Sequence, residues 1–325
     1  FLVGVERSAD AGTVRGVGEA TPLPGWTEGY DACEAGLRDP STEWQNIDSR
    51  LEDRQPPTPA ARHGYRLAVL DVEARANEQS LASMLAARGG FGAPAASVPV
   101  NATIGDGSVP ETVTAARDAV ATGFGCLKLK VGARSLDADL ERVRAVREAV
   151  DATVRLDANG AWDRGTAAEA VDLLGSIGVE YVEQPLPAED LDGLADLRGR
   201  GIDIAVDESV GACGVESVLD AGAADVAVLK PMALGGPDTA TDAARELSAA
   251  GVDPVVTTTI DGAVARAAAV HVAAAMPGER ACGLATGGML ASDFGSDPVP
   301  VVDGEIAVPD GPGNVGTRFD ELVWD

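Results

Sequence analysis

Short apolar runs alternate with amphipathic segments from about residue 97 onward. Most runs recur every 22 to 28 residues and indicate buried strands at 98–104, 126–131, 154–157, 180–183, 204–207, 226–230, 254–258 and 281–286. The segments between them carry helical periodicity, as in 137–150, 166–177, 238–250 and 263–275. Buried strands that alternate with helices predict a parallel sheet, and eight of them favour closure into an α/β barrel.

An open, doubly wound sheet is the alternative arrangement. That fold needs a glycine-rich phosphate-binding turn after its first strand. The stretch Asn101–Gly107 offers only a Gly-x-Gly. The barrel is therefore the preferred fold.

The first 95 residues do not follow this rhythm. They begin with two strand-like pieces and the loop Pro22–Glu28, and a proline-rich stretch at 55–59 leads into a helical pattern over 60–87. We expect a smaller α+β capping domain at 1–95 and a barrel domain at 96–294. The strand and turn material at 295–325 is expected to return to the cap.

The chain is strongly acidic, with a formal net charge of −27 at pH 7 and 45% apolar residues. The apolar content predicts a folded core, and the negative surface argues against nucleic acid and anionic membranes as partners. No apolar run approaches the ~20 residues that a membrane-spanning helix needs. Dispersed acidic residues with arginine as the main base favour a halophilic protein. Whether the chain forms a homo-oligomer is left open.

The first residues of the chain and its cysteines bear on the cellular compartment of the protein. The start, Phe1–Glu6, resembles neither a signal peptide nor a transit peptide. The four cysteines lie far apart and form no Cys-x-x-Cys pair, so we expect neither a disulfide nor a zinc site. A reducing cytoplasm fits this pattern.

Lysine is nearly absent from this chain. The 25 basic residues comprise 22 arginines and only three lysines, Lys128, Lys130 and Lys230. Arginine is effectively never deprotonated, whereas a buried lysine can lose its proton and act as a base. All three lysines fall in apolar, strand-like runs, so they are candidates for proton chemistry.

Acidic residues end three consecutive predicted strands. Asp157, Glu183 and Asp207 are 26 and 24 residues apart, which is one repeat each. The carboxyl ends of parallel strands open on one face of a barrel, where active sites are built. Like charges brought together there repel one another unless a cation neutralises them. Oxygen-only ligands favour Mg²⁺, with Mn²⁺ as the alternative.

The lysines end neighbouring strands of the same set. Lys128 and Lys130 are two residues apart and therefore share one face of their strand, while Lys230 ends the sixth strand. A metal flanked by lysines suits removal of a proton α to a carboxylate. The sequence therefore predicts a metal-dependent enzyme that acts on a small-molecule carboxylate substrate.

These residues resemble those of the enolase superfamily, in its muconate-lactonising branch. In that branch a Lys-x-Lys motif ends the second strand, Asp, Glu and Asp on the next three strands bind Mg²⁺, and a lysine ends the sixth. The resemblance covers nearly the whole chain. It implies a modified TIM barrel of (β/α)7β type with an α+β N-terminal capping domain.

Three segments resemble the o-succinylbenzoate synthases within that branch. They are the cap loop Gly16–Trp26, the sixth-strand turn Leu229–Gly236 and the eighth-strand Gly283–Thr286. The resemblance implies dehydration of a cyclohexadiene carboxylate to o-succinylbenzoate, a step of menaquinone biosynthesis, by a carbon–oxygen lyase. Trp26, on a loop that closes over the substrate, is expected to cover the barrel mouth and exclude water.

The same resemblance implies roles for the site residues. Lys130 removes the α-proton and returns it to the leaving hydroxyl, Lys230 places a cation over the ring, and Lys128 lowers the pKa of Lys130 and contacts the carboxylate. Substrate-contacting or supporting roles fall to Arg155, Asn159, Glu208 and Thr258, the last beside Thr257 and Thr259. A threonine-rich buried strand explains those three threonines equally well.

Other members of the branch share the metal and lysine set. N-acylamino-acid racemases use two opposed lysines, and nothing in Lys130 and Lys230 argues against them. Dipeptide epimerases usually carry Asp-x-Asp on the eighth strand, which Gly283–Thr286 lacks. The mandelate-racemase branch needs a histidine on the seventh strand, but His63 and His271 fall in helical patterns. A non-catalytic, ligand-binding barrel is the remote alternative.

Overall fold

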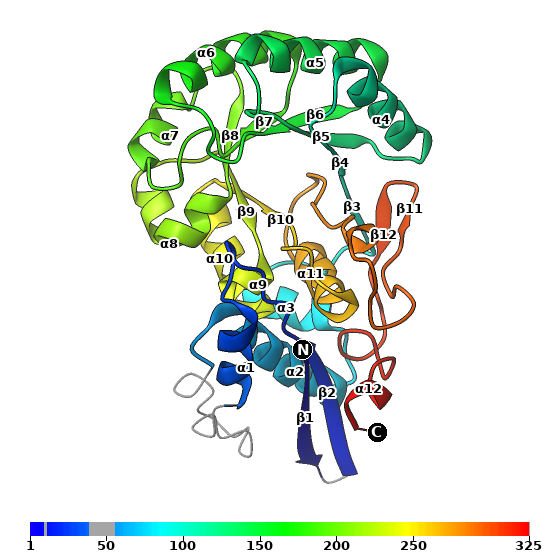
Figure 1. Ribbon diagram of the computed structural model, residues 1–325. Coiled ribbons are helices and arrows are strands. Elements are labelled where there is room, and N and C mark those ends of the chain that lie inside the picture. The colour runs from blue at the N-terminus through cyan, green and yellow to red at the C-terminus, as the bar shows by residue number, and fades with distance from the viewer. Residues whose placement is uncertain (10–11, 39–55, 325) are drawn as a thin grey trace.

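The computed structural model describes residues 1–9, 12–38 and 56–324. Its centre is a curled sheet of seven parallel strands in the order β10-β9-β8-β7-β6-β5-β4 (Figure 1). These strands are β4 (Ala102–Ile104), β5 (Cys126–Lys130), β6 (Thr153–Asp157), β7 (Tyr181–Glu183), β8 (Asp203–Val206), β9 (Val226–Leu229) and β10 (Asp253–Val256). Because every pair of neighbouring strands in this sheet is parallel, the carboxyl ends of all seven strands open on one side.

The eighth apolar run closes the sheet without forming a full strand. Cys282 makes a parallel bridge to Val100, and Gly283 makes one to Thr257. The amide of Cys282 donates to the Pro99 carbonyl at 2.8 Å, and the amide of Gly283 donates to the Val256 carbonyl at 2.9 Å. This segment therefore lies between β10 and the chain before β4, which confirms the modified barrel. The predicted strand 281–286 is correspondingly shorter than expected.

The first predicted strand, 98–104, is wrong as a single element. It divides into β4 and a separate β3 (Ser97–Pro99), which pairs antiparallel with β12 (Glu305–Ala307). β12 in turn pairs with β11 (Val301–Val302). Pro99 has no amide hydrogen to donate to a ladder, and the chain changes partners at that residue.

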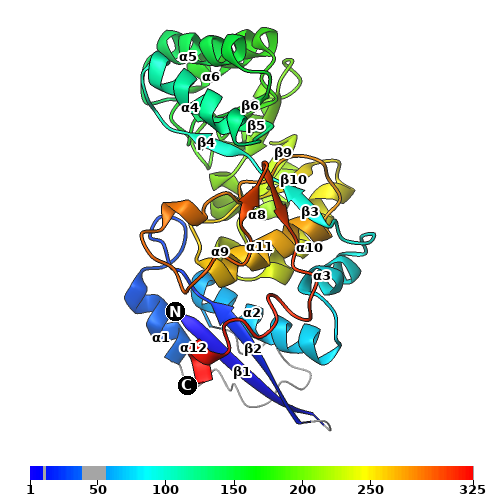
Figure 2. The ribbon, with the colours of Figure 1, turned by 90° about the vertical axis from the view of Figure 1, so that its right-hand side faces the viewer.

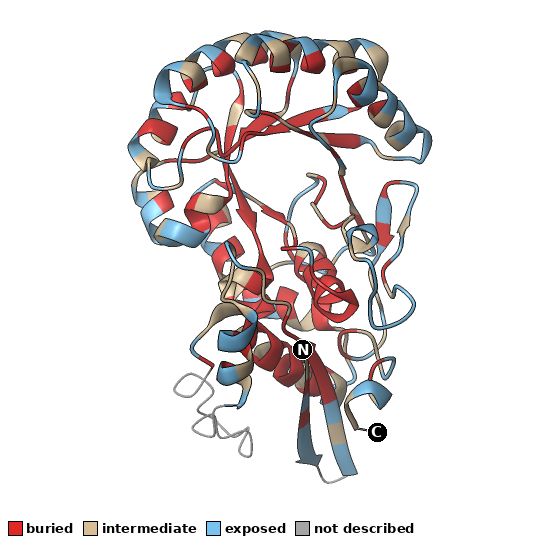
Figure 3. Ribbon diagram, in the orientation of Figure 1, coloured by how far each residue is buried: buried red, intermediate tan, exposed pale blue. Residues whose placement is uncertain are grey.

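A ring of helices covers the outside of the sheet (Figure 1). It comprises α4 (Val109–Ala121), α5 (Leu136–Ala149), α6 (Arg164–Leu174) with the 3₁₀ turn η1 (Gly175–Ile177), α7 (Leu191–Leu197), α8 (Glu208–Asp220), α9 (Pro231–Leu234), α10 (Pro237–Ala249) and α11 (Ala263–Ala275). On β5, Leu127 and Leu129 are fully buried, while Lys128 and Lys130 are partly exposed. This alternation places the leucines against the helices and the lysines inside the barrel, and Figure 3 shows the strands as a buried layer.

The N-terminal part is a β-hairpin packed on a helix. Strands β1 (Leu2–Ala9) and β2 (Gly12–Glu19) are antiparallel, followed by α1 (Tyr30–Arg38), α2 (Pro59–Ala76) and α3 (Leu81–Gly89). At Gly18 an added Cβ would lie 1.9 Å from the backbone oxygen of Gly64 in α2, so only glycine permits this close approach. Most of the proline-rich stretch at 55–59 is described, but residue 55 lies outside the described residues.

The helix predicted over 60–87 is two helices. α2 ends before Asn77, and α3 begins after Ser80, whose hydroxyl accepts a hydrogen bond from the amide of Ser83 at 3.2 Å. Glu78, between them, has a φ of +51°. A serine cap and a left-handed residue start a new helix here, although the apolar periodicity continues across the break.

The end of the chain returns to the hairpin. The 3₁₀ turn η2 (Gly287–Met289) follows the eighth run, and the last helix, α12 (Glu321–Trp324), lies beside β1 (Figure 2). The Arg15 guanidinium of β2 lies 5.1 Å from the ring centroid of Trp324. The domain boundaries near 95 and 295 stay predictions. Within the described ranges, no helix is both long enough and apolar enough to cross a membrane.

Candidate active site

Three carboxylates meet at the carboxyl ends of adjacent strands. Asp157 ends β6, Glu183 ends β7, and Asp207 follows β8. The sheet register places Asp157 directly beside Glu183. All three side chains are buried, with exposed fractions of 1%, 1% and 6%. The one-repeat spacing in the sequence therefore does bring these acids into one cluster.

All three lysines of the chain bind these carboxylates. The Lys128 Nζ lies 2.7 Å from the Glu183 Oε1 and 2.9 Å from the Asp157 Oδ2. The Lys130 Nζ lies 2.6 Å from the same Asp157 oxygen. Lys230 is buried and donates to both carboxylate oxygens of Asp207. Lysines from β5 and from the end of β9 thus lie on opposite sides of the acidic cluster.

The buried charges shift one another's pKa values. Burial, helped by the charges of Asp157 and Asp207 and opposed by Lys128, raises the pKa of Glu183 to about 8. Burial also works against a charged Asp157, but Lys128 and Lys130 outweigh it and lower the pKa of that carboxyl. Lys128 is likewise buried, yet Glu183 and Asp157 hold its pKa well above the ordinary value. Lys128 therefore stays a fixed cation beside Lys130.

The donor chemistry of the cluster fits a hard divalent cation. The three carboxylates are neighbours, but in the part of the chain that the structure describes no group of three or more His, Cys, Asp or Glu side chains is arranged to hold a metal ion as it stands. The lysine ammonium groups lie on the carboxylate oxygens instead. Three buried carboxylates on adjacent strand ends need positive charge, and their ligand atoms are all oxygen, as Mg²⁺ and Mn²⁺ prefer. Asp157, Glu183 and Asp207 therefore fit a metal of this class.

Asn159 and Glu208 extend the network around Lys130. The Asn159 Oδ1 accepts from the Lys130 Nζ at 2.8 Å, and its Nδ2 donates to the Glu208 Oε1 at 3.0 Å. The amide of Asn159 also donates to the Asp157 carboxylate at 3.1 Å, with a backbone φ of +44°. These contacts orient Lys130 and Asp157 from one side, which is consistent with a supporting role.

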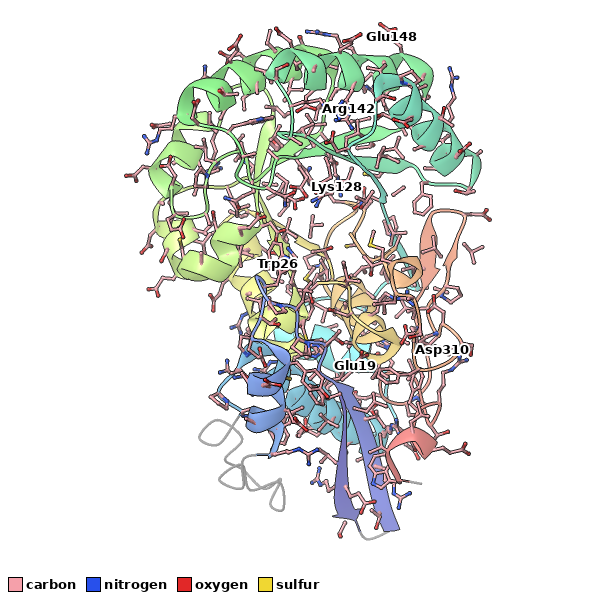
Figure 4. All side chains as sticks on the ribbon, in the orientation of Figure 1. Glu19, Trp26, Lys128, Arg142, Glu148 and Asp310 are labelled. Atoms are coloured by element: carbon pink, nitrogen blue, oxygen red, sulfur yellow. The ribbon has the colours of Figure 1, made fainter. Side chains whose placement is uncertain are left out.

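Trp26 brings the cap onto the barrel. Its ring centroid lies 3.5 Å from the Lys230 Nζ, within the range of a cation–π contact. A turn in which the amides of Trp26 and Thr27 donate to the Leu23 carbonyl holds the loop in place. A cavity of about 390 Å³ lies beneath it, lined by residues that include Trp26, Asp207, Glu208 and Lys230. Figure 4 shows Trp26 on the side of the cap that faces the barrel and Lys128 inside the barrel.

Arg155 lies away from the mouth, so its expected contact with a substrate is wrong. Its guanidinium donates to Glu180 and to the Ala281 carbonyl, and it lies 4.7 Å from the ring centroid of Tyr181. Glu180 and Ala281 stand at the amino ends of β7 and of the eighth run. Arg155 shares the inward face of β6 with Asp157, but its side chain extends toward the opposite end of the barrel.

The three threonines after β10 bond within the protein. The Thr258 and Thr286 hydroxyls lie 2.8 Å apart, and Thr257 donates to the Gly283 carbonyl at 2.8 Å. The Thr259 hydroxyl donates to the Asp261 carboxylate at 2.6 Å. These contacts favour the interpretation of a buried, threonine-rich strand end over direct binding of a substrate carboxylate.

Glu19 links the cap to the barrel, a role that was not predicted from the sequence. Its buried carboxylate accepts from the amides of Val264 and Ala265 in the first turn of α11, at 3.0 and 2.8 Å. Burial raises the pKa of Glu19, while the bond from Ala265 opposes that rise. Glu19 stands at the base of the loop that carries Trp26. Its partners lie about 245 residues away in the sequence, so no local pattern reveals the contact.

His63 and His271 serve the packing of helices, as expected. His63 in α2 lies with its Nδ1 2.8 Å from the Glu19 carbonyl, and the His271 Nε2 in α11 lies 2.6 Å from the Asn314 carbonyl. Both are fully buried, and burial lowers the pKa of each to about 4. Both rings are therefore neutral near pH 7 and lie outside the acidic cluster.

Solved structures share this architecture. The L-Ala-D/L-Glu epimerase from Bacillus subtilis is 26% identical, with a TM-score of 0.86 over 97% of this chain and 90% of that chain. A muconate lactonizing enzyme from Klebsiella pneumoniae is 28% identical, with a TM-score of 0.84 over 96% and 90%. A dipeptide epimerase from Methylococcus capsulatus, complexed with Mg and the dipeptide L-Arg-D-Lys, is 30% identical, with a TM-score of 0.83 over 97% and 91%.

Sequence relatives point to the same group of enzymes. The o-succinylbenzoate synthase of Thermobifida fusca is 42% identical over 218 residues, which are 65% of this chain and 66% of that protein. The o-succinylbenzoate synthase of Mycobacterium marinum is 40% identical over 223 residues, which are 66% of this chain and 65% of that protein. The chain thus spans just under two thirds of the length of these curated relatives. Residues 111–323 match the family described as enolase C-terminal domain-like. The resemblance predicted from the strand-end acids and lysines is confirmed, and the chain belongs to the enolase C-terminal domain-like family.

Proposed function

We propose that this protein is an o-succinylbenzoate synthase, a lyase that dehydrates a cyclohexadiene carboxylate in menaquinone biosynthesis. One observation carries the proposal. The only three lysines of a chain with 22 arginines all bind the three carboxylates that end β6, β7 and β8. The relatives that bear this name, at 42% and 40% identity, support the choice of reaction.

A divalent metal completes the proposed site. Enzymes of this superfamily are generally dependent on such a metal. Asp157, Glu183 and Asp207 would hold it, and Mg²⁺ is the preferred ion, with Mn²⁺ as the alternative. When bound, the metal supplies positive charge that stabilises the negative charge developing on the substrate carboxylate. The remaining chemistry belongs to the side chains of this chain.

Lys130 moves the proton. Its neutral amine takes the hydrogen from the carbon α to the substrate carboxylate, so that the C–H bond breaks and its electron pair enters the ring system. The same electrons form the new C=C bond as the β-hydroxyl leaves, and the Lys130 ammonium returns the proton to that hydroxyl to give water. Atoms and charge balance without an oxidant or reductant. Its side chain is 37% exposed, so Lys130 can reach a bound substrate.

Other groups hold the reacting ring in place. Lys230 presents its ammonium opposite Lys130, where a cation stabilises negative charge spread over a planar ring. Lys128 supplies a fixed positive charge beside Lys130 and the carboxylate. Trp26 covers the side of the cavity next to Lys230 and excludes water.

The direct test is an absorbance assay of the dehydration. Purified protein is given Mg²⁺ and the cyclohexadiene carboxylate at high salt, beside one sample with EDTA and one with Lys130→Ala. We expect fast turnover that both controls abolish. A folded protein that binds the metal but shows no turnover would contradict the dehydratase while leaving proton abstraction in place.

Racemisation of N-acylamino acids is the second candidate. The favouring observation is that Lys130 and Lys230 bind different carboxylates, Asp157 and Asp207, on two sides of the cluster. Two opposed bases are what a racemase needs. Exchange of the α-hydrogen of N-acylamino acids with deuterium from solvent, for both enantiomers, would support this activity over dehydration.

The surroundings of the enzyme are part of the proposal. The acidic composition argues against nucleic acid and anionic membranes as partners and supports a cytoplasm of high salt content. The four cysteines, Cys33, Cys126, Cys213 and Cys282, are free thiols, which supports a reducing compartment. Activity and unfolding temperature measured against KCl concentration test the proposed halophilic character.

A further inference from the structure

Asp207 stands where an aspartate usually caps a helix, but its side chain does not do so. Asp163 and Asp190 precede α6 and α7, and their carboxylates accept from the amides of Thr166 and Gly193 at 2.8 and 3.1 Å. Asp207 precedes α8 in the same way, and its side chain makes no bond to the first turn. Its carboxylate binds Lys230 instead. Something else must satisfy the first amides of α8.

Gln184 provides the missing acceptor. Its Oε1 accepts from the amide of Asp207 at 3.0 Å and from the amide of Ser209 at 3.1 Å. Gln184 follows Glu183 at the end of β7 and has no exposed surface. It therefore caps α8 from the neighbouring strand, which leaves the carboxylate of Asp207 available for the acidic cluster.

Every hydrogen-bonding atom of this amide has a partner. The Nε2 donates to the Leu186 carbonyl at 3.0 Å and to the Ser209 hydroxyl at 2.8 Å. The amides of Asp207 and Ser209 need an oxygen acceptor, and the Leu186 carbonyl needs an N–H donor. These needs fix which end of the Gln184 side-chain amide faces α8. The Ser209 hydroxyl donates onward to the Ala188 carbonyl at 2.7 Å. Few substitutions reproduce this set of partners.

The backbone of Gln184 is held in an uncommon conformation. Its φ is +42°, in the left-handed region that residues other than glycine, asparagine and aspartate seldom adopt. Its carbonyl accepts from the amide of Gly160 at 2.7 Å, and its amide donates to the Ala205 carbonyl at 2.8 Å. Such strain persists only where surrounding contacts enforce it, and it concentrates at functional sites.

We propose that Gln184 is the positioning residue of the metal site, because it takes the capping bonds that would otherwise draw the carboxylate of Asp207 onto α8. This inference rests on the proposed function, in which Asp207 is a metal ligand. Without the Gln184 amide, the amide of Ser209 lacks its acceptor, and the Asp207 side chain turns to it, because a helix-capping aspartate accepts from the amide two or three residues on. The cluster then lacks its third carboxylate.

The test measures metal binding without substrate. Free Mn²⁺ is counted by electron paramagnetic resonance in titrations of the wild type and of Gln184→Met, which has a side chain of similar size and no hydrogen-bonding group. Loss of a group that orients a metal ligand typically weakens binding about 10- to 100-fold. We expect Gln184→Met to bind Mn²⁺ within that range of weakening.

Gln184→Glu is the matched control. It keeps an oxygen for the amides of Asp207 and Ser209 but loses the donor to the Leu186 carbonyl and the Ser209 hydroxyl. Both variants are therefore expected to unfold at a lower temperature than the wild type. Only Gln184→Met is expected to lose Mn²⁺ affinity, whereas Gln184→Glu stays within about threefold of the wild type, well short of the loss typical for an orienting group. Should Gln184→Met fail to fold, Gln184→Asn, whose amide is too short to reach both donors, replaces it.

Two results would overturn the inference. One is a folded Gln184→Met that binds Mn²⁺ as tightly as the wild type. The other is equal loss of affinity in both variants, which would mean that general loosening of the site, and not the capping bonds, controls binding. A wild type that binds no Mn²⁺ would contradict the proposed metal site itself, so failure of the two proposals can be told apart.

Discussion

The two ends of the barrel carry the same kind of ion pair made from different bases. At the carboxyl end, Lys128, Lys130 and Lys230 bind Asp157, Glu183 and Asp207. At the amino end, Arg280 binds Glu180, Asp203 and Asp253 at 3.0, 2.8 and 2.9 Å, and Arg155 binds Glu180 as well. Both clusters balance charges, but only a lysine can give up its proton.

The electrostatics of the amino end keep its two arginines charged. Burial works against a charge on Arg280, but the hydrogen bonds to Asp203 and Asp253 raise its pKa above the ordinary value. Arg155 behaves in the same way, with Tyr181 and Glu180 among the groups that outweigh its burial. We therefore infer that the arginine ion pairs at the amino end stabilise the barrel, whereas the lysines at the carboxyl end serve proton transfer.

The largest effect is expected when a lysine at the carboxyl end is replaced by arginine, the basic residue of the amino end. Lys130→Arg keeps the positive charge but removes the group that can be deprotonated. We expect kcat to fall about 10²- to 10⁴-fold, the usual contribution of a general base. The assay is the dehydration described above, with thermal unfolding to confirm an intact fold. A folded variant with kcat within threefold of the wild type would show that Lys130 is not the base.

Breaking the amino end tests the opposite half of the comparison. Arg280→Met leaves three carboxylates without their shared cation, and we expect the free energy of unfolding to fall by about 1–3 kcal/mol. The kcat measured well below the unfolding temperature is expected to match the wild type. Arg280→Lys, which reaches fewer partners, should lose less stability. A loss of kcat in folded Arg280→Met would mean that the two ends are coupled.

The smallest expected effect concerns the cover of the carboxyl end. Trp26→Ala removes the ring that contacts Lys230, and we expect kcat/KM to fall about tenfold, which corresponds to ~1.4 kcal/mol, with little change in stability. Trp26→Phe keeps an aromatic face and should recover most of the activity. Normal kinetics together with a large loss of stability would identify Trp26 as a packing residue and not a lid.

Much of the fold could be predicted because the repeat is local. Each strand–helix unit spans 22 to 28 residues, and the period of apolar positions within a unit does not depend on the rest of the molecule. The helix predicted at 263–275 coincides with α11, and 137–150 differs from α5 by one residue at each end. Errors arose where the pattern continued across a change of partner, as at Pro99, or across a cap, as at Ser80.

The acidic cluster could also be predicted, for a geometric reason. Parallel strands that follow one another in sequence lie side by side, so acids spaced by one repeat at strand ends must become neighbours. Nothing in the sequence shows toward which end of the barrel an inward side chain extends. Arg155, two residues before Asp157, therefore looked equivalent to it and turned out to belong to the other end.

The sequence by itself determined which residue types stand at the strand ends, and hence the barrel, the acidic cluster and the lysines that bind it. Only the tertiary structure decided which other side chains contact or position the residues at the strand ends. Trp26 reaches Lys230, Glu19 reaches α11 and Gln184 caps α8 across gaps of many residues. Such contacts depend on how separate elements pack together, and hydrophobic periodicity within an element carries no information about its neighbours in space.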